Sequence, residues 1–186
     1  MIWDDNEDIC LLHCEGTRRA VQQALDAHRE ERRPYLFITD KMQPVTELRR
    51  ILVPVTMLEE EVYKAEICTY LARKTGATIV LLRANDYGSH ARQNMQRIIT
   101  HITTVSARTG ETIHYEELVG QKDSFHLNQE AARRTDLDCQ LLLLTASREY
   151  GLDDWLFGPA ERTAILRSPV PVMLINPRAD LFSLCD

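Results

Sequence analysis

The sequence lacks several features that would define whole classes of protein. It has only seven prolines and seven glycines in 186 residues, which argues against a fibrous, low-complexity or disordered chain. No apolar stretch is long enough to span a bilayer, and the acidic start Met-Ile-Trp-Asp-Asp-Asn-Glu-Asp is unlike a secretory signal. We therefore expect a globular protein that stays in the cytoplasm and makes no contact with a membrane.

Positive charge is outnumbered by negative charge. The chain has 22 Lys and Arg residues against 28 Asp and Glu residues, so its formal net charge is −6. A field of this sign repels the phosphate backbone, and nucleic acid is not expected as a partner. The five cysteines include no Cys-x-x-Cys pair, which favours reduced thiols over a disulfide framework.

A metal site could be imagined at Cys10, His13 and Cys14. The stretch has the character of a strand, in which positions 10 and 14 share one face while position 13 points to the other. Such a set does not converge on one ion, so we favour ordinary strand residues and predict no metal.

The usual catalytic motifs are missing as well. The sequence contains no Gly-x-Ser-x-Gly elbow, no Walker-type loop and no His-Glu-x-x-His, and its six histidines show no ligand spacing. Three consecutive glutamates, Glu59 to Glu61, stand at a predicted helix start, where carboxylates complement the helix dipole. We expect no enzyme activity and no cofactor.

What the sequence does contain is a regular alternation of short apolar and longer amphipathic segments from about residue 51. This alternation predicts βαβ units and a parallel sheet with helices on both faces. The predicted strands are 51–55, 78–82, 112–116, 140–144 and 170–175. The predicted helices are 59–75, ending at Gly76, 91–108, ending near Gly110, a third capped by Ser124 and running to about 134, and a fourth opened by Gly158 and Pro159.

The first 45 residues predict a further βαβ unit. Strands are expected at 9–13 and 35–39, with a helix over 17–31 between them. A stretch over 41–48 that contains Pro44 reads as a linker. The chain thus divides into an N-terminal extension, 1–45, and a main domain, 46–186.

Residues 50–177 resemble the universal stress protein family in the order and spacing of their segments. The first strand at 51–55, the helix end Ala72-Arg-Lys-Thr-Gly-Ala77, Val119-Gly120 and the closing stretch 168–175 carry the resemblance. It implies an open, parallel five-stranded sheet of order 3-2-1-4-5. The N-terminal strand, Gly16-Thr17, helix and second strand also resemble the end of such a domain, so the extension is either the vestige of a first half-domain or an unrelated unit.

Family members that bind ATP use an aspartate after the first strand and a glycine-rich loop after the fourth. The resemblance places Thr56 at the aspartate, Thr145 and Arg148 at the first two glycines, Gly158 at the third and Pro159 at the following Ser or Thr. Glycine is needed there because the backbone must approach phosphate closely, and Pro159 removes both a hydroxyl and an N–H donor. We therefore predict a degenerate site that does not bind ATP. Arg148 either fills the vacated phosphate position or binds another anion.

Two functions remain open from the sequence. One is a non-catalytic stress-response module that acts through dimerisation and a protein partner. The other is a sensor of a nucleotide or small anion in the cleft at the carboxyl ends of strands one and four. The apolar fifth strand, 170–175, predicts a homodimer in which its edge pairs with a second copy. The alternative is that the N-terminal unit covers this edge within the chain.

Overall fold

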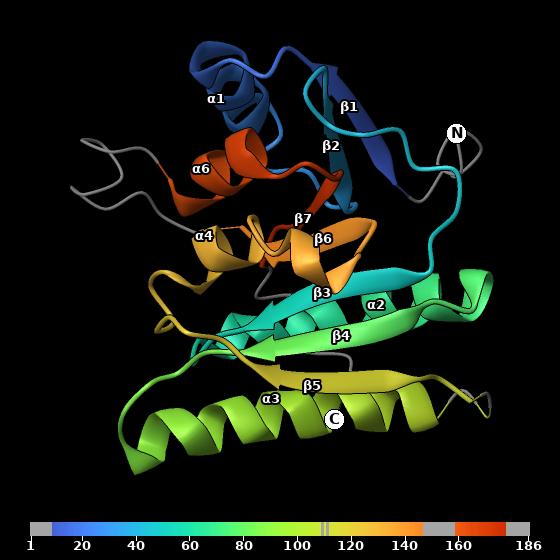
Figure 1. Ribbon diagram of the computed structural model, residues 1–186, viewed down its shortest axis with the longest axis vertical. Coiled ribbons are helices and arrows are strands. Elements are labelled where there is room, and N and C mark those ends of the chain that lie inside the picture. The colour runs from blue at the N-terminus through green and yellow to red at the C-terminus, as the bar shows by residue number, and fades with distance from the viewer. Residues whose placement is uncertain (1–8, 109, 111, 147–158, 178–186) are drawn as a thin grey trace.

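Seven strands form one sheet in the computed structural model, which describes residues 9–108, 110, 112–146 and 159–177 (Figure 1). The strands are β1 (Cys10–Cys14), β2 (Tyr35–Thr39), β3 (Arg50–Val55), β4 (Thr78–Arg83), β5 (Tyr115–Val119), β6 (Leu141–Thr145) and β7 (Val172–Ile175). The helices are α1 (Arg18–Ala27), η1 (Glu59–Tyr63), α2 (Lys64–Thr75), α3 (Ser89–Ala107), α4 (Leu127–Ala131), η2 (Thr135–Leu137) and α6 (Ala160–Arg167).

The strand order is β1-β2-β7-β6-β3-β4-β5. Numbered 1 to 5 in chain order, the strands of the main domain are β3, β4, β5, β6 and β7. Their order across the sheet, starting at β5, is 3-2-1-4-5, so the predicted fold class is confirmed. All pairs within this part are parallel. Because the chain crosses over between parallel strands, helices cover both faces: α2 packs against α3, whereas α6 packs against both α4 and α1.

The N-terminal extension joins the same sheet, which makes it seven strands wide. Strand β1 pairs parallel with β2, and β2 pairs antiparallel with β7 through Tyr35–Leu174, Leu36–Met173 and Phe37–Val172. The outer edge of β7 is therefore occupied within the chain, as the second sequence-based alternative expected. A second copy could pair with β7 only if β2 were displaced.

Local signals explain most element boundaries. The Thr17 side chain accepts a hydrogen bond from the Ala20 N–H and caps α1. Gly76 ends α2 in the left-handed conformation, φ 73°, that glycine adopts without strain. Pro159 stands at the N-cap of α6, as predicted for this helix start. None of the described helices combines the length and the apolar character that crossing a membrane requires.

Two sequence-based predictions were wrong. Strand β5 begins three residues later than expected and runs to Val119, and its carboxylates have partners across the sheet: Glu116 contacts Arg50 and Glu117 contacts Arg83. Ser124 caps no helix. The predicted third helix is broken into α4 and η2, and α4 starts after His126 without a side-chain cap.

Candidate functional site

The candidate site is the region between β3 and β6 at the carboxyl ends of the strands, which we call the crevice. Pairing of β3 with β4 runs as far as Val55–Arg83, whereas its pairing with β6 stops at Leu52–Leu142. The two strands then lead to helices on opposite faces, since η1 and α2 follow β3 and α6 follows β6. Such a switch point is where open α/β sheets bind ligands.

Thr56, which the resemblance aligns with an aspartate of ATP-binding proteins, lies in this crevice and is almost fully buried, 2% exposed. Its hydroxyl donates to Glu61 Oε1 at 3.1 Å and accepts from the Leu58 N–H at 3.3 Å. The hydroxyl is thus engaged inside the protein and is not presented to a ligand.

Glu61 is itself buried and forms an ion pair with Lys64, which has no exposed surface. Lys64 Nζ also donates to the carbonyl oxygen of Pro54 in β3 at 2.7 Å. Since η1 packs against β6, the Thr56–Glu61–Lys64 network occupies the region where β3 and β6 separate. The Glu59–Glu61 run is therefore more than a charged helix start.

The other predicted site residues give less information about ligand binding. Thr145 ends β6, and its buried Oγ1 has no hydrogen-bond partner among the described residues. Pro159 leaves the start of α6 without a side-chain cap, and the first turn carries Glu161, which is 3% exposed. A carboxylate at a helix start already complements the dipole that would otherwise favour phosphate. Arg148 and Gly158 lie outside the described residues.

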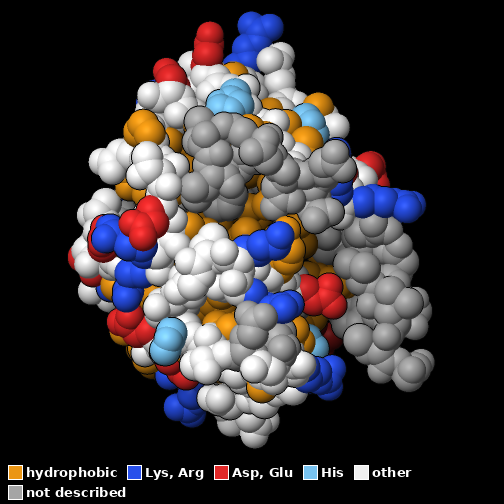
Figure 2. Space-filling view, turned by 90° about the vertical axis from the view of Figure 1, so that its right-hand side faces the viewer, with side chains coloured by type: hydrophobic (Ala, Val, Ile, Leu, Met, Phe, Trp, Pro, Cys, Tyr) orange, Lys and Arg blue, Asp and Glu red, His pale blue; other side chains and the backbone are white. Residues whose placement is uncertain are grey.

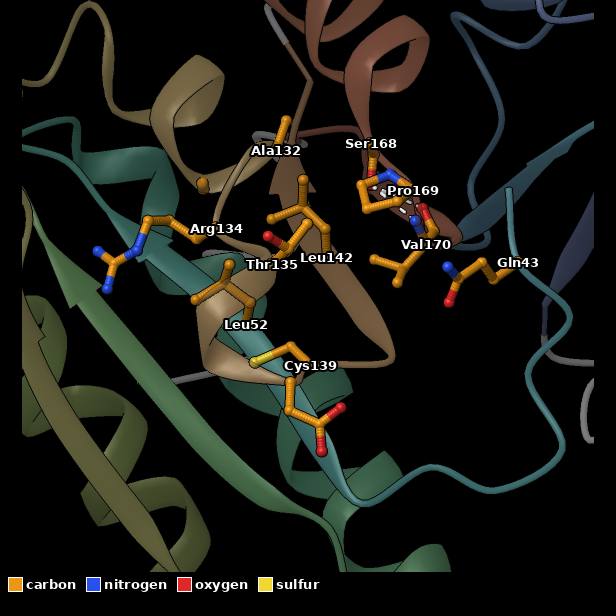
Figure 3. Close-up of a pocket in the computed structure, with 12 residues that line it drawn as sticks. Gln43, Leu52, Ala132, Arg134, Thr135, Cys139, Leu142, Ser168, Pro169 and Val170 are labelled. Atoms are coloured by element: carbon orange, nitrogen blue, oxygen red, sulfur yellow. Dashed lines mark hydrogen bonds between the residues drawn. The ribbon is translucent and has the colours of Figure 1, made fainter. Parts of the chain in front are cut away.

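A cavity of about 210 Å³ lies at the opposite end of the strands, near the amino ends of β3, β6 and β7 (Figure 3). Apolar side chains appear among charged ones on this side of the molecule (Figure 2). The charges at the cavity are paired: Arg134 bonds Asp136 at 2.8 and 2.9 Å, and Arg49 lies 3.5 Å from Asp138. Burial raises the pKa of the Cys139 thiol to about 11, so this cavity offers no reactive thiolate at neutral pH.

A shallower hollow of about 430 Å³ lies at the carboxyl ends of β1 and β2, beside His13 and Cys14. The Gly16 N–H, which an anion would need, instead donates to Asp40 Oδ1 at 2.6 Å. Burial, with the Asp40 charge, raises the pKa of Cys14. Over the described part of the chain, no three His, Cys, Asp or Glu side chains are placed to hold a metal.

Sequence reasoning missed Glu61 and Lys64 as members of the site. Their spacing of three residues at a helix start is that of an ordinary exposed pair, and nothing local reveals that both are buried. The available signal was Thr56: its hydroxyl at the end of an apolar strand needs a hydrogen-bond partner, and the nearby glutamates can supply one.

The sequence matches no protein-family model and no curated protein. The fold does have relatives among solved structures. A universal stress protein from Archaeoglobus fulgidus DSM 4304 superposes with a TM-score of 0.65 at 16% identity, over 95% of this chain and 63% of its own. A functionally unknown protein from Pseudomonas aeruginosa PAO1 gives 0.56 at 15%, over 95% and 65%. A universal stress protein solved in complex with cAMP gives 0.53 at 14%, over 72% and 100%.

The covered fractions of each chain indicate which of these structures include a counterpart of the N-terminal extension. The chain spans less than two thirds of the two longer structures, yet those structures cover 95% of it, which must include most of the β1–α1–β2 unit. The shorter structure is matched completely by 72% of this chain. The extension thus has a counterpart in the longer proteins, and the chain as a whole has the universal stress protein fold.

Proposed function

We propose that the chain is a non-catalytic module of the universal stress protein type, which acts by binding a protein partner and does not bind ATP. The observation that carries this proposal is the buried Thr56–Glu61–Lys64 network. A nucleotide in the crevice would have to displace the Glu61–Lys64 ion pair, whose two charges compensate each other and are hydrogen-bonded. Displacement would leave a buried charge without its partner, which is costly.

The start of α6 supports the same proposal. Phosphate binding at a helix start depends on free N–H groups and on the positive end of the dipole. Here Pro159 has no N–H, and the buried carboxylate of Glu161 brings negative charge to the first turn. An incoming triphosphate would meet repulsion there.

Thermal unfolding with and without Mg-ATP tests the proposal. A ligand at 100 times its dissociation constant adds about 2.7 kcal/mol of stability, which is easily detected. We expect no change in the melting temperature at millimolar Mg-ATP and no heat of binding by calorimetry. A dissociation constant in the low micromolar range would overturn the proposal.

A sensor of a nucleotide or small anion is the second candidate. It is supported by the Thr145 hydroxyl, which is buried without a described hydrogen-bond partner at the crevice, and by the fold relative solved with cAMP. Titration with cAMP, AMP and inorganic phosphate separates the two functions. Binding that is lost in Thr145→Val would favour the sensor, whereas no binding favours the interaction module.

A further inference from the structure

All four large hydrophobic side chains that are exposed in the described part of the chain lie at the carboxyl ends of neighbouring strands. Leu58 follows β3, Tyr87 follows β4, and Val119 and Phe125 end and follow β5. The carboxyl ends of these three strands lie together at the left of Figure 1. Leu58 is 54% exposed, Phe125 75% and Tyr87 96%. We call Leu58, Tyr87 and Phe125 the loop-tip patch.

One hydrogen-bond cluster holds the three loops together. Ser124 Oγ accepts from the Met57 N–H at 2.9 Å, the Ser124 N–H donates to Asp86 Oδ1 at 3.1 Å, and the Ser124 hydroxyl donates to the other oxygen of Asp86. Each member of the patch is the residue directly after one of these three: Leu58 after Met57, Tyr87 after Asp86, Phe125 after Ser124. The cluster therefore brings three sequence-distant apolar side chains to one corner.

Further bonds fix the loops behind the patch. The Asn85 N–H donates to the Lys122 carbonyl oxygen at 2.8 Å, and the Gly120 N–H donates to that of Arg83 at 2.8 Å. The Glu130 carboxylate accepts from the N–H groups of Gln121 and Lys122. Loops that are already ordered lose little backbone entropy on binding, which favours their use as an interaction surface.

The charges around the patch indicate what it binds. Four carboxylates lie beside the patch, those of Glu59 and Glu60 at the start of η1 and those of Asp86 and Asp123 in the loops. The basic side chains in these loops are Lys122 and His126, and the His126 ring lies 2.8 Å from Asp123 Oδ1. Exposed aromatic rings could stack on nucleic-acid bases, but these carboxylates repel phosphate. A second copy would bring the same carboxylates face to face.

We infer that the loop-tip patch is a docking site for a protein segment that presents apolar side chains together with Lys or Arg. This inference rests on the proposed function and names the surface and the partner's chemistry. Aromatic and aliphatic side chains supply the contact, as in other protein interfaces, and the acidic rim selects basic partners.

A synthetic amphipathic helical peptide of Leu and Lys is the probe, and its Leu and Glu counterpart is the control. Fluorescence anisotropy measures binding to the full chain, to the triple variant Leu58→Ser, Tyr87→Ser, Phe125→Ser, and to a matched variant on α3, Gln93→Ser, Gln96→Ser, Thr100→Ser. We expect the patch variant to bind the Lys peptide about tenfold more weakly or worse. The α3 variant should bind like the wild type, and added salt should weaken binding.

Two further measurements keep the outcome clear. Circular dichroism and urea unfolding should be unchanged in the patch variant, since its three side chains are exposed. Ser124→Ala, which breaks the cluster but keeps the apolar side chains, should weaken binding by a smaller factor. Equal affinity of the patch variant and the wild type, or equal affinity for the Glu peptide, overturns the inference.

Self-association is a separate outcome. A wild-type dimer that becomes monomeric in the patch variant would identify the occupant as a second copy and overturn the inference as stated. Failure here is distinguishable from failure of the proposed function, because the latter is decided by ATP and cAMP binding at the crevice and not by the patch.

Discussion

Lys64 and Glu61 form an ion pair inside the protein, with side chains that are 0% and 4% exposed, at the carboxyl end of β3. We expect Lys64→Met to lower the free energy of unfolding by about 3–5 kcal/mol, because Glu61 is then left buried without its counter-charge. Urea unfolding followed by circular dichroism measures this loss.

The double variant Glu61→Gln, Lys64→Met is the control for this prediction. It removes both charges, so it should be more stable than Lys64→Met alone. Arg97→Met on the exposed face of α3 should change stability by less than about 0.5 kcal/mol. A Lys64→Met protein as stable as Arg97→Met would show that the pair contributes nothing.

Thr56 gives a second test of the same network. Thr56→Val removes the hydroxyl that Glu61 and the Leu58 N–H both contact, which should cost about 1–3 kcal/mol. Thr56→Asp introduces the aspartate that the universal stress protein resemblance implies for this position, but it places a second carboxylate against buried Glu61. We therefore expect a larger loss of stability and still no ATP binding. Micromolar ATP binding by Thr56→Asp in calorimetry would contradict the proposal that this region does not bind ATP.

The sequence predicted the fold well because apolar runs identify buried strands directly. Leu141 to Leu144 are apolar without alternation, and β6 is central and buried on both faces. The features that escaped prediction depend on contacts between distant residues. Ser124 looked like a helix cap, and only the fold brings it to Asp86 and Met57. Glu117 fell outside the predicted strand 112–116, and its partner Arg83 lies on the neighbouring strand β4.

The raised pKa values of two buried cysteines lead to a prediction about stability in alkaline solution. Burial raises the pKa of Cys68 to about 12 and that of Cys139 to about 11, from an ordinary value of 9.0. The folded state therefore holds these protons more tightly than the unfolded state does. The resulting stability is complete below about pH 9 and is lost as the pH rises toward 11 to 12.

Urea midpoints at pH 8 and pH 10.5 measure this effect. The wild type should lose more stability over this interval than Cys139→Ser, which lacks one of the two groups. Alkylation of native protein at pH 8, mapped by mass spectrometry, should leave Cys68 and Cys139 largely unmodified. An identical pH dependence in the wild type and Cys139→Ser would remove Cys139 from this account.

Asn176 joins the N-terminal unit to the end of β7. Its Nδ2 donates to the carbonyl oxygens of His28 and Glu31, both at 3.0 Å, and its Oδ1 accepts from the Tyr35 hydroxyl at 3.1 Å. Asn176→Asp cannot donate and places charge near two carbonyls, so we expect it to be less stable than Asn176→Ala. Limited proteolysis should cut the 28–34 segment faster in both variants than in the wild type. Equal cleavage rates in the wild type and the variants would contradict this role of Asn176.

The last prediction concerns the edge of β7, which β2 covers through three paired residues, Val172, Met173 and Leu174. Removing residues 1–44 uncovers a short apolar strand edge with unpaired backbone groups, and such edges pair with other chains. We expect the truncated protein to form dimers or larger species in light scattering. The full chain, with β2 in place, should have the mass of a single chain at the same concentration. A homodimer of the full chain through β7 would require β1–α1–β2 to leave its own sheet, and proteolysis of the released unit would reveal that exchange. A truncated chain that stays monomeric and equally resistant to heat would show that the N-terminal unit does not protect this edge.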